Sequence, residues 1–146
     1  MKAILLSLFV ALLMVGCGEQ VVDNAKLQDR DGLKYLPNEE TPFTGRAEGF
    51  YPNGQKAMET NYKDGKEDGI KNRWYNSSFK EDKTGQKHVQ INNKDNKVVS
   101  AVAWKPNGEK CPETNVKDGN GVLVYYNNDG TVWVRSTFKD GELVFD

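Results

Sequence analysis

The chain has 146 residues, of which 20 are basic and 21 acidic, so its formal net charge is −1. This balance argues against a nucleic-acid binder that tracks phosphates, since such proteins carry an excess of Lys and Arg. The length suits one domain. Hydrophobic residues make up 37% of the chain, partly in the first fifteen residues, so burial elsewhere depends on 6 Phe, 3 Trp and 6 Tyr.

Residues 1–16 (MKAILLSLFVALLMVG) predict a signal peptide. The uncharged run at 3–15 is shorter than the roughly 20 residues that a membrane-spanning helix needs. It leads into Leu-Met-Val-Gly-Cys at 13–17, which resembles the processing site of bacterial lipoprotein signal peptides. The resemblance implies that Cys17 becomes the first residue and carries diacylglycerol and a further acyl chain such as palmitate, which together anchor a protein firmly. The alternative is an ordinary signal peptide with an incidental cysteine.

The next segment, residues 17–30, is polar and is expected to be a tether between the lipid and the folded domain. Gly18 stands where many inner-membrane lipoproteins carry Asp, so the resemblance implies an outer-membrane location facing the periplasm. If Cys17 carries lipid, Cys111 has no cysteine partner in the chain. We therefore expect Cys111 to be a half-buried strand residue rather than a nucleophile.

From residue 31 onward, evenly spaced glycines predict a repeat domain over 31–146. Intervals of 9 and then 11 residues separate successive glycines, and a further glycine follows after two or four residues. The period of about 22–24 residues lies in the range of repeat architectures. Copies are expected at about 45–69, 69–99, 99–121 and 121–146. The second copy is degenerate, because Ser78 replaces its turn glycine and a polar insert lengthens the strand that follows.

The aligned copies predict β-hairpins. An aromatic residue lies four residues before each first turn, and an apolar residue lies three residues before each later turn. Matching positions in the copies recur every second residue, as they do in a β-strand. Asn-Gly and Asp-Gly pairs between them favour tight hairpin turns. The expected fold class is all-β, with consecutive antiparallel hairpins forming one elongated sheet. An isolated hairpin is only marginally stable, so the aromatic residues are expected to be buried together on one face of this sheet. This aromatic column consists of Phe50, Trp74, Trp104 and Tyr126.

The stretch FYPNGQKAMETNYKDGKEDG at 50–69 resembles the variant MORN repeat, and the resemblance extends over about 43–146. It implies strings of β-hairpins and no catalytic residues. Many bacterial members of that family are exported lipoproteins, and a subset is described as the antitoxin side of a toxin–antitoxin pair.

The sequence offers few candidate catalytic or metal-binding residue sets. The single histidine, His88, lies in a polar stretch and is expected to be a solvated side chain. No second His or Cys offers zinc-ligand spacing, and Lys66 interrupts the acidic turn at 64–69 where a calcium loop needs an oxygen ligand. No nucleophile, base and acid set is evident, so we expect neither an enzyme nor a cofactor.

The remaining candidate is a surface. The sheet face opposite the aromatic column would carry aromatic and Arg side chains, which protein interfaces favour, although ordinary cross-strand pairing is an alternative. We therefore expect a membrane-anchored interaction module, antitoxin-like by resemblance, whose partner is a protein and not nucleic acid. The alternatives are a structural envelope protein that binds peptidoglycan or glycan, an enzyme, and a binder of anionic lipid headgroups. The residues expected on the interaction face are Tyr51, Arg73, Tyr75, Tyr125, Trp133 and Arg135.

Overall fold

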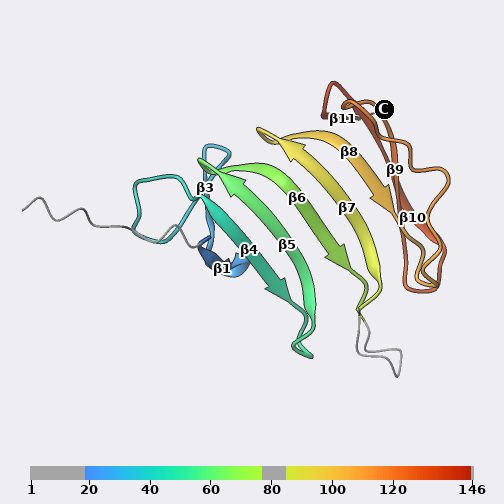
Figure 1. Ribbon diagram of the computed structural model, residues 1–146, viewed down its shortest axis with the longest axis horizontal. Coiled ribbons are helices and arrows are strands. Elements are labelled where there is room, and N and C mark those ends of the chain that lie inside the picture. The colour runs from blue at the N-terminus through green and yellow to red at the C-terminus, as the bar shows by residue number, and fades with distance from the viewer. Residues whose placement is uncertain (1–18, 77–84, 146) are drawn as a thin grey trace, which may run out of the picture.

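The computed structural model describes residues 19–76 and 85–145, which form strands and one short 3-10 helix (Figure 1). The signal segment and Cys17 lie outside the described residues. The elements are β1 (Val21–Asp23), η1 (Asn24–Lys26), β2 (Gln28–Arg30), β3 (Leu33–Tyr35), β4 (Gly45–Phe50), β5 (Lys56–Lys63), β6 (Lys66–Trp74), β7 (Lys87–Lys94), β8 (Lys97–Ala103), β9 (Gly121–Tyr126), β10 (Val132–Lys139) and β11 (Glu142–Val144).

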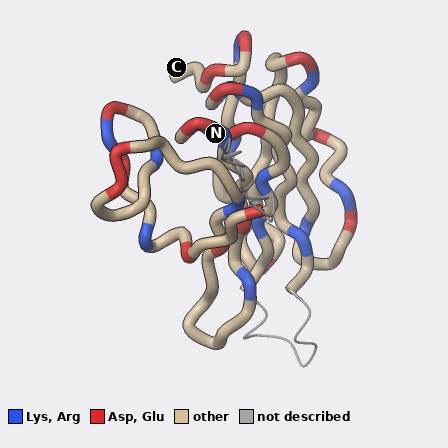
Figure 2. Tube along the Cα trace, turned by 60° about the vertical axis from the view of Figure 1, so that its left-hand side comes forward, with Lys and Arg blue, Asp and Glu red and all other residues tan. Residues whose placement is uncertain are grey.

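The strands form two main sheets and a small ribbon. The larger sheet has the order β1-β4-β5-β6-β7-β8, in which β4 to β8 are consecutive antiparallel strands and β1 runs parallel to β4. The second sheet has the order β11-β10-β9, and β2 pairs with β3 alone. The described chain is therefore all-β and built from antiparallel hairpins, as the sequence predicts. Basic and acidic positions are scattered along the trace among uncharged ones (Figure 2).

Tight turns explain why these segments pair as hairpins. Five turns place two successive residues at positive φ, the geometry that two-residue hairpin loops need. Four of them end in glycine, and the fifth uses Asn96 at φ 66° after Asp95 at φ 50°. Asn is among the few residues that tolerate this region. The turn in the degenerate copy therefore keeps the shape of the others, and β6, β7 and β8 pair in one uninterrupted sheet.

The other ends of the hairpins also share one design. In each of three turns, a glycine N–H donates to the carbonyl three residues earlier: Gly54 to Tyr51 at 2.9 Å, Gly108 to Lys105 at 2.9 Å and Gly130 to Asn127 at 3.0 Å. An Asn or Asp side chain in each turn then accepts from the N–H two residues later. Such short-range bonds fix the turn without help from the rest of the fold.

The expectation of one elongated sheet is wrong, because the ladder breaks after β8. Residues 110–117 run beside β8 but form only an isolated bridge, Trp104 to Lys110, and single bonds such as Cys111 N–H to the Ala103 carbonyl at 2.8 Å. Pro112 has no N–H to give to a ladder, and proline inside a sheet is confined to edges and irregular positions. Strand β9 therefore starts a separate sheet that packs against the end of the first.

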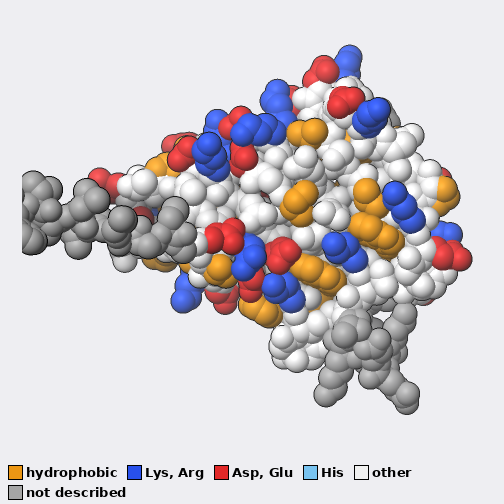
Figure 3. Space-filling view, in the orientation of Figure 1, with side chains coloured by type: hydrophobic (Ala, Val, Ile, Leu, Met, Phe, Trp, Pro, Cys, Tyr) orange, Lys and Arg blue, Asp and Glu red, His pale blue; other side chains and the backbone are white. Residues whose placement is uncertain are grey.

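The dry interior differs from the expected aromatic column. Phe50 is 54% exposed and Tyr126 only 5% exposed. Trp74 and Trp104 are half-buried, with the Lys56 and Lys87 ammonium groups 5.9 and 5.6 Å from their ring centres. In the view of Figure 3, hydrophobic side chains are interspersed with Lys and Arg and form no continuous apolar strip. The column is therefore not a core.

The reason lies in β-bulges. The pairing register shifts by one residue beside three of the four aromatics, Phe50, Trp74 and Tyr126. A one-residue shift redirects side chains, so the period of two cannot be extended across it. Of the aromatic column, only Tyr126 belongs to the main core. The core otherwise comes from Tyr75, from β7, β8 and β9, and from the segment between the sheets: Tyr75, Val89, Ile91, Ala101, Ala103, Cys111, Val116, Leu123, Val124 and Tyr126.

The N-terminal segment also differs from its expected role. Of the expected tether, residues 21–30 form β1, η1 and β2, and β1 is a member of the larger sheet. Val22 and Leu27 pack against a second cluster formed by Phe43, Ala47 and Tyr62. These apolar side chains are buried on folding, which is why the segment joins the domain.

Candidate interaction face

Two of the tyrosines expected on the face join neighbouring hairpins. The Tyr51 hydroxyl donates to the Trp74 carbonyl at 2.7 Å, and the Tyr75 hydroxyl donates to the Trp104 carbonyl at 2.7 Å. Each bond fixes the ring and satisfies a carbonyl at a strand end. Tyr75 is only 7% exposed and belongs to the main core. Tyr75 is therefore a structural residue, and its expected place on an open surface is wrong.

Tyr75 nevertheless begins a continuous line of rings that reaches the surface, which we call the aromatic row (Tyr75, His88, Tyr125 and Trp133). Tyr75 and His88 are stacked with ring centres 4.2 Å apart and an interplanar angle of 25°. His88 meets Tyr125 edge-on at 5.7 Å, and Tyr125 meets Trp133 edge-on at 6.2 Å. Trp133 is 63% exposed. The row thus connects the core to an open ring, with the spacings of favourable aromatic pairs.

β-Bulges set the side-chain orientation of two members of the aromatic row. On β7, His88 is the extra residue between Lys87, which pairs with Trp74, and Val89, which pairs with Arg73. On β10, Trp133 is the extra residue between Val132, which pairs with Tyr126, and Val134, which pairs with Tyr125. A bulge redirects the side chain that it carries, and bulges are common beside functional sites. The two rings therefore owe their placement to the same local device on β7 and β10.

His88 is half-buried rather than solvated, which corrects the expectation from sequence. Its Nε2 accepts the Tyr126 N–H at 3.4 Å. Burial, with a smaller contribution from the Arg73 charge, lowers the pKa of His88 to about 4. The ring is therefore neutral at pH 7 and acts as an aromatic spacer.

A signal for His88 was present in the sequence. In the intact copies, Gly54, Gly108 and Gly130 are each followed three residues later by Ala57, Cys111 and Trp133, respectively. Gly85 precedes His88 by the same interval. Gly85 is also eleven residues before Asn96, the interval seen in the intact copies. The strand of the degenerate copy is thus of ordinary length. The extra residues precede Gly85, and those at 77–84 lie outside the described part.

Arg73 lies on β6 between Met58 and Val89 of the neighbouring strands, and its side chain is exposed. Burial raises the pKa of Tyr51 and of Tyr125, and the nearby Arg73 charge partly offsets each rise. The Arg73 charge therefore acts on the pKa values of both tyrosines and of His88.

Arg135 does not join this group. Its guanidinium binds the Glu113 carboxylate at 2.8 Å, and its cross-strand partner is Val124 rather than Tyr125. Both partners of this ion pair are exposed, so the pair contributes little to stability.

The open end of the aromatic row lies in an apolar region. Of the eight large hydrophobic side chains that are exposed in the described part of the chain, six lie in residues 132–145. These six residues are close in sequence, although neighbouring strand residues such as Leu143 and Val144 point to opposite faces of the sheet. We call this set the apolar patch: Val132, Trp133, Val134, Leu143, Val144 and Phe145.

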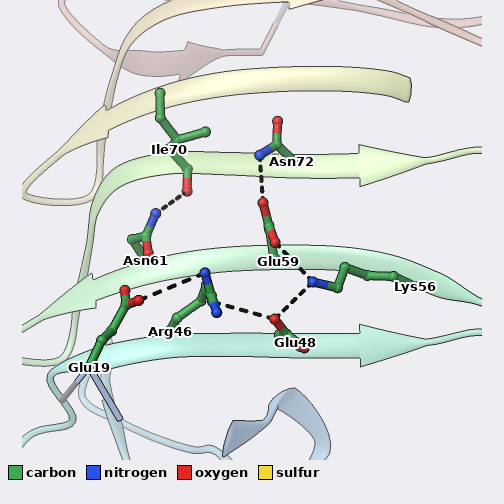
Figure 4. A network of polar contacts seen from close by, with 8 residues as sticks. All are labelled: Glu19, Arg46, Glu48, Lys56, Glu59, Asn61, Ile70 and Asn72. Atoms are coloured by element: carbon green, nitrogen blue, oxygen red, sulfur yellow. Dashed lines mark hydrogen bonds and ion pairs between the residues drawn. The ribbon is translucent and has the colours of Figure 1, made fainter. Parts of the chain in front are cut away.

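A separate polar network spans β4, β5 and β6 (Figure 4). Lys56 Nζ lies 2.8 Å from Glu48 and 3.2 Å from Glu59, and the Asn72 amide donates to Glu59 at 2.8 Å. Burial alone would raise the pKa of Glu59, but hydrogen bonds from Asn72 and Lys56 outweigh it and lower the pKa. Glu59 is thus ionised at neutral pH and is no proton donor. The network cross-links the strands, and the one Lys56 ammonium reduces the repulsion between the two facing carboxylates.

No family model, curated protein or solved structure matches the chain. Within residues 19–76 and 85–145, no helix is long and apolar enough to cross a membrane. In the same part of the chain, no group of three or more His, Cys, Asp or Glu side chains could hold a metal ion.

Proposed function

We propose that the chain is a non-catalytic protein-interaction module, held at the bacterial cell envelope by lipid on Cys17, and that the apolar patch on β10 and β11 is its binding surface. One observation carries the surface assignment: six of the eight exposed large hydrophobic side chains in the described residues lie in the patch. Leaving such side chains in water forgoes roughly 25 cal/mol per Å² of apolar area that a partner would cover. Trp133 also fits the role, because Trp is enriched among the residues that dominate binding energy.

The anchor, the repeat architecture and the nature of the partner rest on the sequence. The processing site before Cys17 supports lipidation, and the equal glycine intervals support a repeat of the variant MORN type. The resemblance to that family suggests a toxin as the partner and an antitoxin-like role. The large mixed-charge surface gives no reason to add nucleic acid as a second partner.

The test is recovery of a partner from the envelope with the full chain. An affinity-tagged chain is solubilised gently, and bound proteins are quantified for the wild type, for Trp133→Ser and for Phe50→Ser. Phe50 is the matched control, because it is an exposed aromatic outside the patch. We expect a stoichiometric protein that is lost with Trp133→Ser and kept with Phe50→Ser.

Two outcomes contradict the proposal. Recovery of no stoichiometric protein, or equal loss with both variants, means that the patch is not a specific surface. Sedimentation of the wild type with purified peptidoglycan, abolished by Trp133→Ser, would instead assign the patch to a structural protein that binds the cell wall or its glycans.

A further inference from the structure

Strand β10 has a neighbour along its whole length on only one side. In its sheet, β9 lies on one side of β10 and β11 on the other. Strand β9 pairs with Val132 and with residues 134–138, whereas β11 pairs only with Thr137–Lys139. Among the strands that the structure describes, none pairs with Val132–Ser136 on the β11 side. We call this stretch the open edge of β10 (Val132–Ser136).

The first hairpins show what the corresponding edge holds. The strands β4-β5-β6 have the same order as β9-β10-β11, and the glycines at 45, 54 and 65 match those at 121, 130 and 141. There β6 has nine residues and continues along β5, for example in the pair Glu59–Asn72, whereas β11 has three residues. Strand β5 is half-buried or buried over Lys56–Tyr62, but β10 is exposed over Val132–Arg135. An antiparallel strand therefore matches the open edge.

The backbone of Arg135 points toward the open edge. On β9, the Val124 N–H donates to Thr114 Oγ1 at 3.1 Å, and the Val122 N–H donates to Asn115 Oδ1 at 2.7 Å. Both N–H groups therefore point away from β10. Opposite residues of an antiparallel ladder alternate between hydrogen-bonded and non-hydrogen-bonded pairs. Val124 and Arg135 form a pair of the second kind, so the N–H and C=O of Arg135 are directed away from β9.

The apolar patch is arranged around this edge rather than on one face. Neighbouring side chains of a strand point to opposite faces, so Trp133 and Val134 belong to different sides of the sheet unless the bulge redirects one of them. A partner strand along the edge would contact side chains on both sides at once. In such strand addition, main-chain hydrogen bonds provide affinity and the flanking side chains provide specificity.

A second copy of the chain fits the open edge less well than a free segment does. If two β10 strands paired antiparallel along Val132–Ser136, residue 131 of the second copy would lie opposite Thr137. Val144 already pairs with Thr137 at that place. The turn at 127–131 of the second copy would therefore run into the end of β11, whereas a short extended segment has no such turn.

We infer that the protein partner binds by strand addition: an extended segment of the partner pairs antiparallel with the open edge of β10, in line with β11. The segment supplies an N–H and a C=O opposite Arg135 and apolar side chains that cover Trp133 and Val134. The inference rests on the proposed function and adds the form of the partner segment, which has no proline opposite Arg135.

The test uses Arg135→Pro in the full-length tagged chain, with partner recovery from the envelope as the measurement. Proline has no N–H and obstructs pairing on the side to which that N–H pointed. The Arg135 N–H is not used by β9, so the variant should fold, whereas Ser136→Pro should disrupt the sheet. We expect Arg135→Pro to lower partner recovery at least about tenfold. The matched control is Glu113→Ala, which also removes the Glu113–Arg135 ion pair but should keep the partner.

Amide hydrogen exchange gives a second measurement that needs no variant. In the free wild-type chain, the Arg135 amide should exchange rapidly while the Val134 and Ser136 amides, which face β9, exchange slowly. Addition of the recovered partner should slow exchange at Arg135. This measurement decides alone if Arg135→Pro proves to be unfolded.

Three results would overturn the inference: full recovery of the partner with folded Arg135→Pro, slow exchange of the Arg135 amide in the free chain, or no slowing of that exchange by the partner. Recovery of a second copy of the chain as the partner would assign the edge to self-association and also overturn it. The proposed function is judged separately by Trp133→Ser. If that variant loses the partner while Arg135→Pro keeps it, strand addition is refuted and the interaction module stands.

Discussion

Lowering the pH should destabilise the fold through His88, and the size of the effect follows from its surroundings. The pKa of His88 is about 4 in the folded chain, against an ordinary value of 6.5. The unfolded chain therefore takes up the proton first as the pH falls. The contribution of neutral His88 is fully present above pH 6.5 and is lost as the pH falls through 6.5 toward 4.

The shift of about 2.5 pKa units corresponds to at most ~3.5 kcal/mol, at about 1.4 kcal/mol per unit. His88 is only half-buried, so solvent screening reduces this, and we expect about 1–2 kcal/mol. The cause is burial against Tyr75 and Tyr125, with the Arg73 charge second.

The assay is denaturant unfolding of the wild type and of His88→Phe at pH 7.5 and at pH 4.5. Phe keeps a ring between Tyr75 and Tyr125 and has no proton to bind. Carboxylates titrate in both proteins, so the difference between them isolates His88. We expect the wild type to lose about 1–2 kcal/mol more than the variant on acidification. Equal losses, or an NMR titration that places the pKa of His88 near 6.5, would refute the reasoning.

Three further predictions concern backbone, core and anchor. Gly119→Ala should lower the free energy of unfolding by roughly 1–2 kcal/mol more than Gly54→Ala does. Both glycines have φ near +80°, but an added Cβ at Gly119 would lie 2.7 Å from the backbone of the 139–142 turn, whereas one at Gly54 would face open space. Similar costs in thermal or denaturant unfolding would contradict this. Leu123→Ala should cost about 3–5 kcal/mol and Trp104→Ala about 1–2, since Leu123 is fully buried and Trp104 only half-buried; the reverse order would restore the aromatic column as a core. Cys17→Ser should leave an unprocessed precursor that takes up no labelled fatty acid, and normal processing would refute the lipid anchor.

The parts of the fold that local chemistry decides were predictable from the sequence. Asp-Gly pairs fix the hairpin turns, and Asn96 was recognisable as a glycine substitute because Asn tolerates positive φ. The strand assignment follows, because the segments between the turns alternate in polarity. Such features depend on residues that are close in the chain.

The parts that depend on register and on long-range packing were not predictable in the same way. A β-bulge beside Trp74 changes which side chains point to which face of the sheet, and no particular residue type marks the position of such a bulge. Pro112 was visible, but its consequence, a second sheet packed on the end of the first, depends on where β9 finds apolar surface. Polarity alone likewise could not show that residues 21–30 join the larger sheet.

The candidate site shows the same division. Tyr125 and Trp133 do lie in one line of rings, although a β-bulge and not simple alternation places Trp133 there. Tyr75 is buried in the main core between the two sheets, and Arg135 pairs with Val124 and binds Glu113 instead. His88 was missed because the degenerate copy was aligned on Ser78 rather than on Gly85.

The most direct test of the proposed binding surface is photo-crosslinking in the native envelope. The photo-reactive p-benzoylphenylalanine is placed at Trp133 in one full-length chain and at Phe50 in another, since both side chains are exposed and aromatic. The account predicts one discrete protein adduct from position 133 and none from position 50. No adduct from position 133, or the same adducts from both positions, would contradict it.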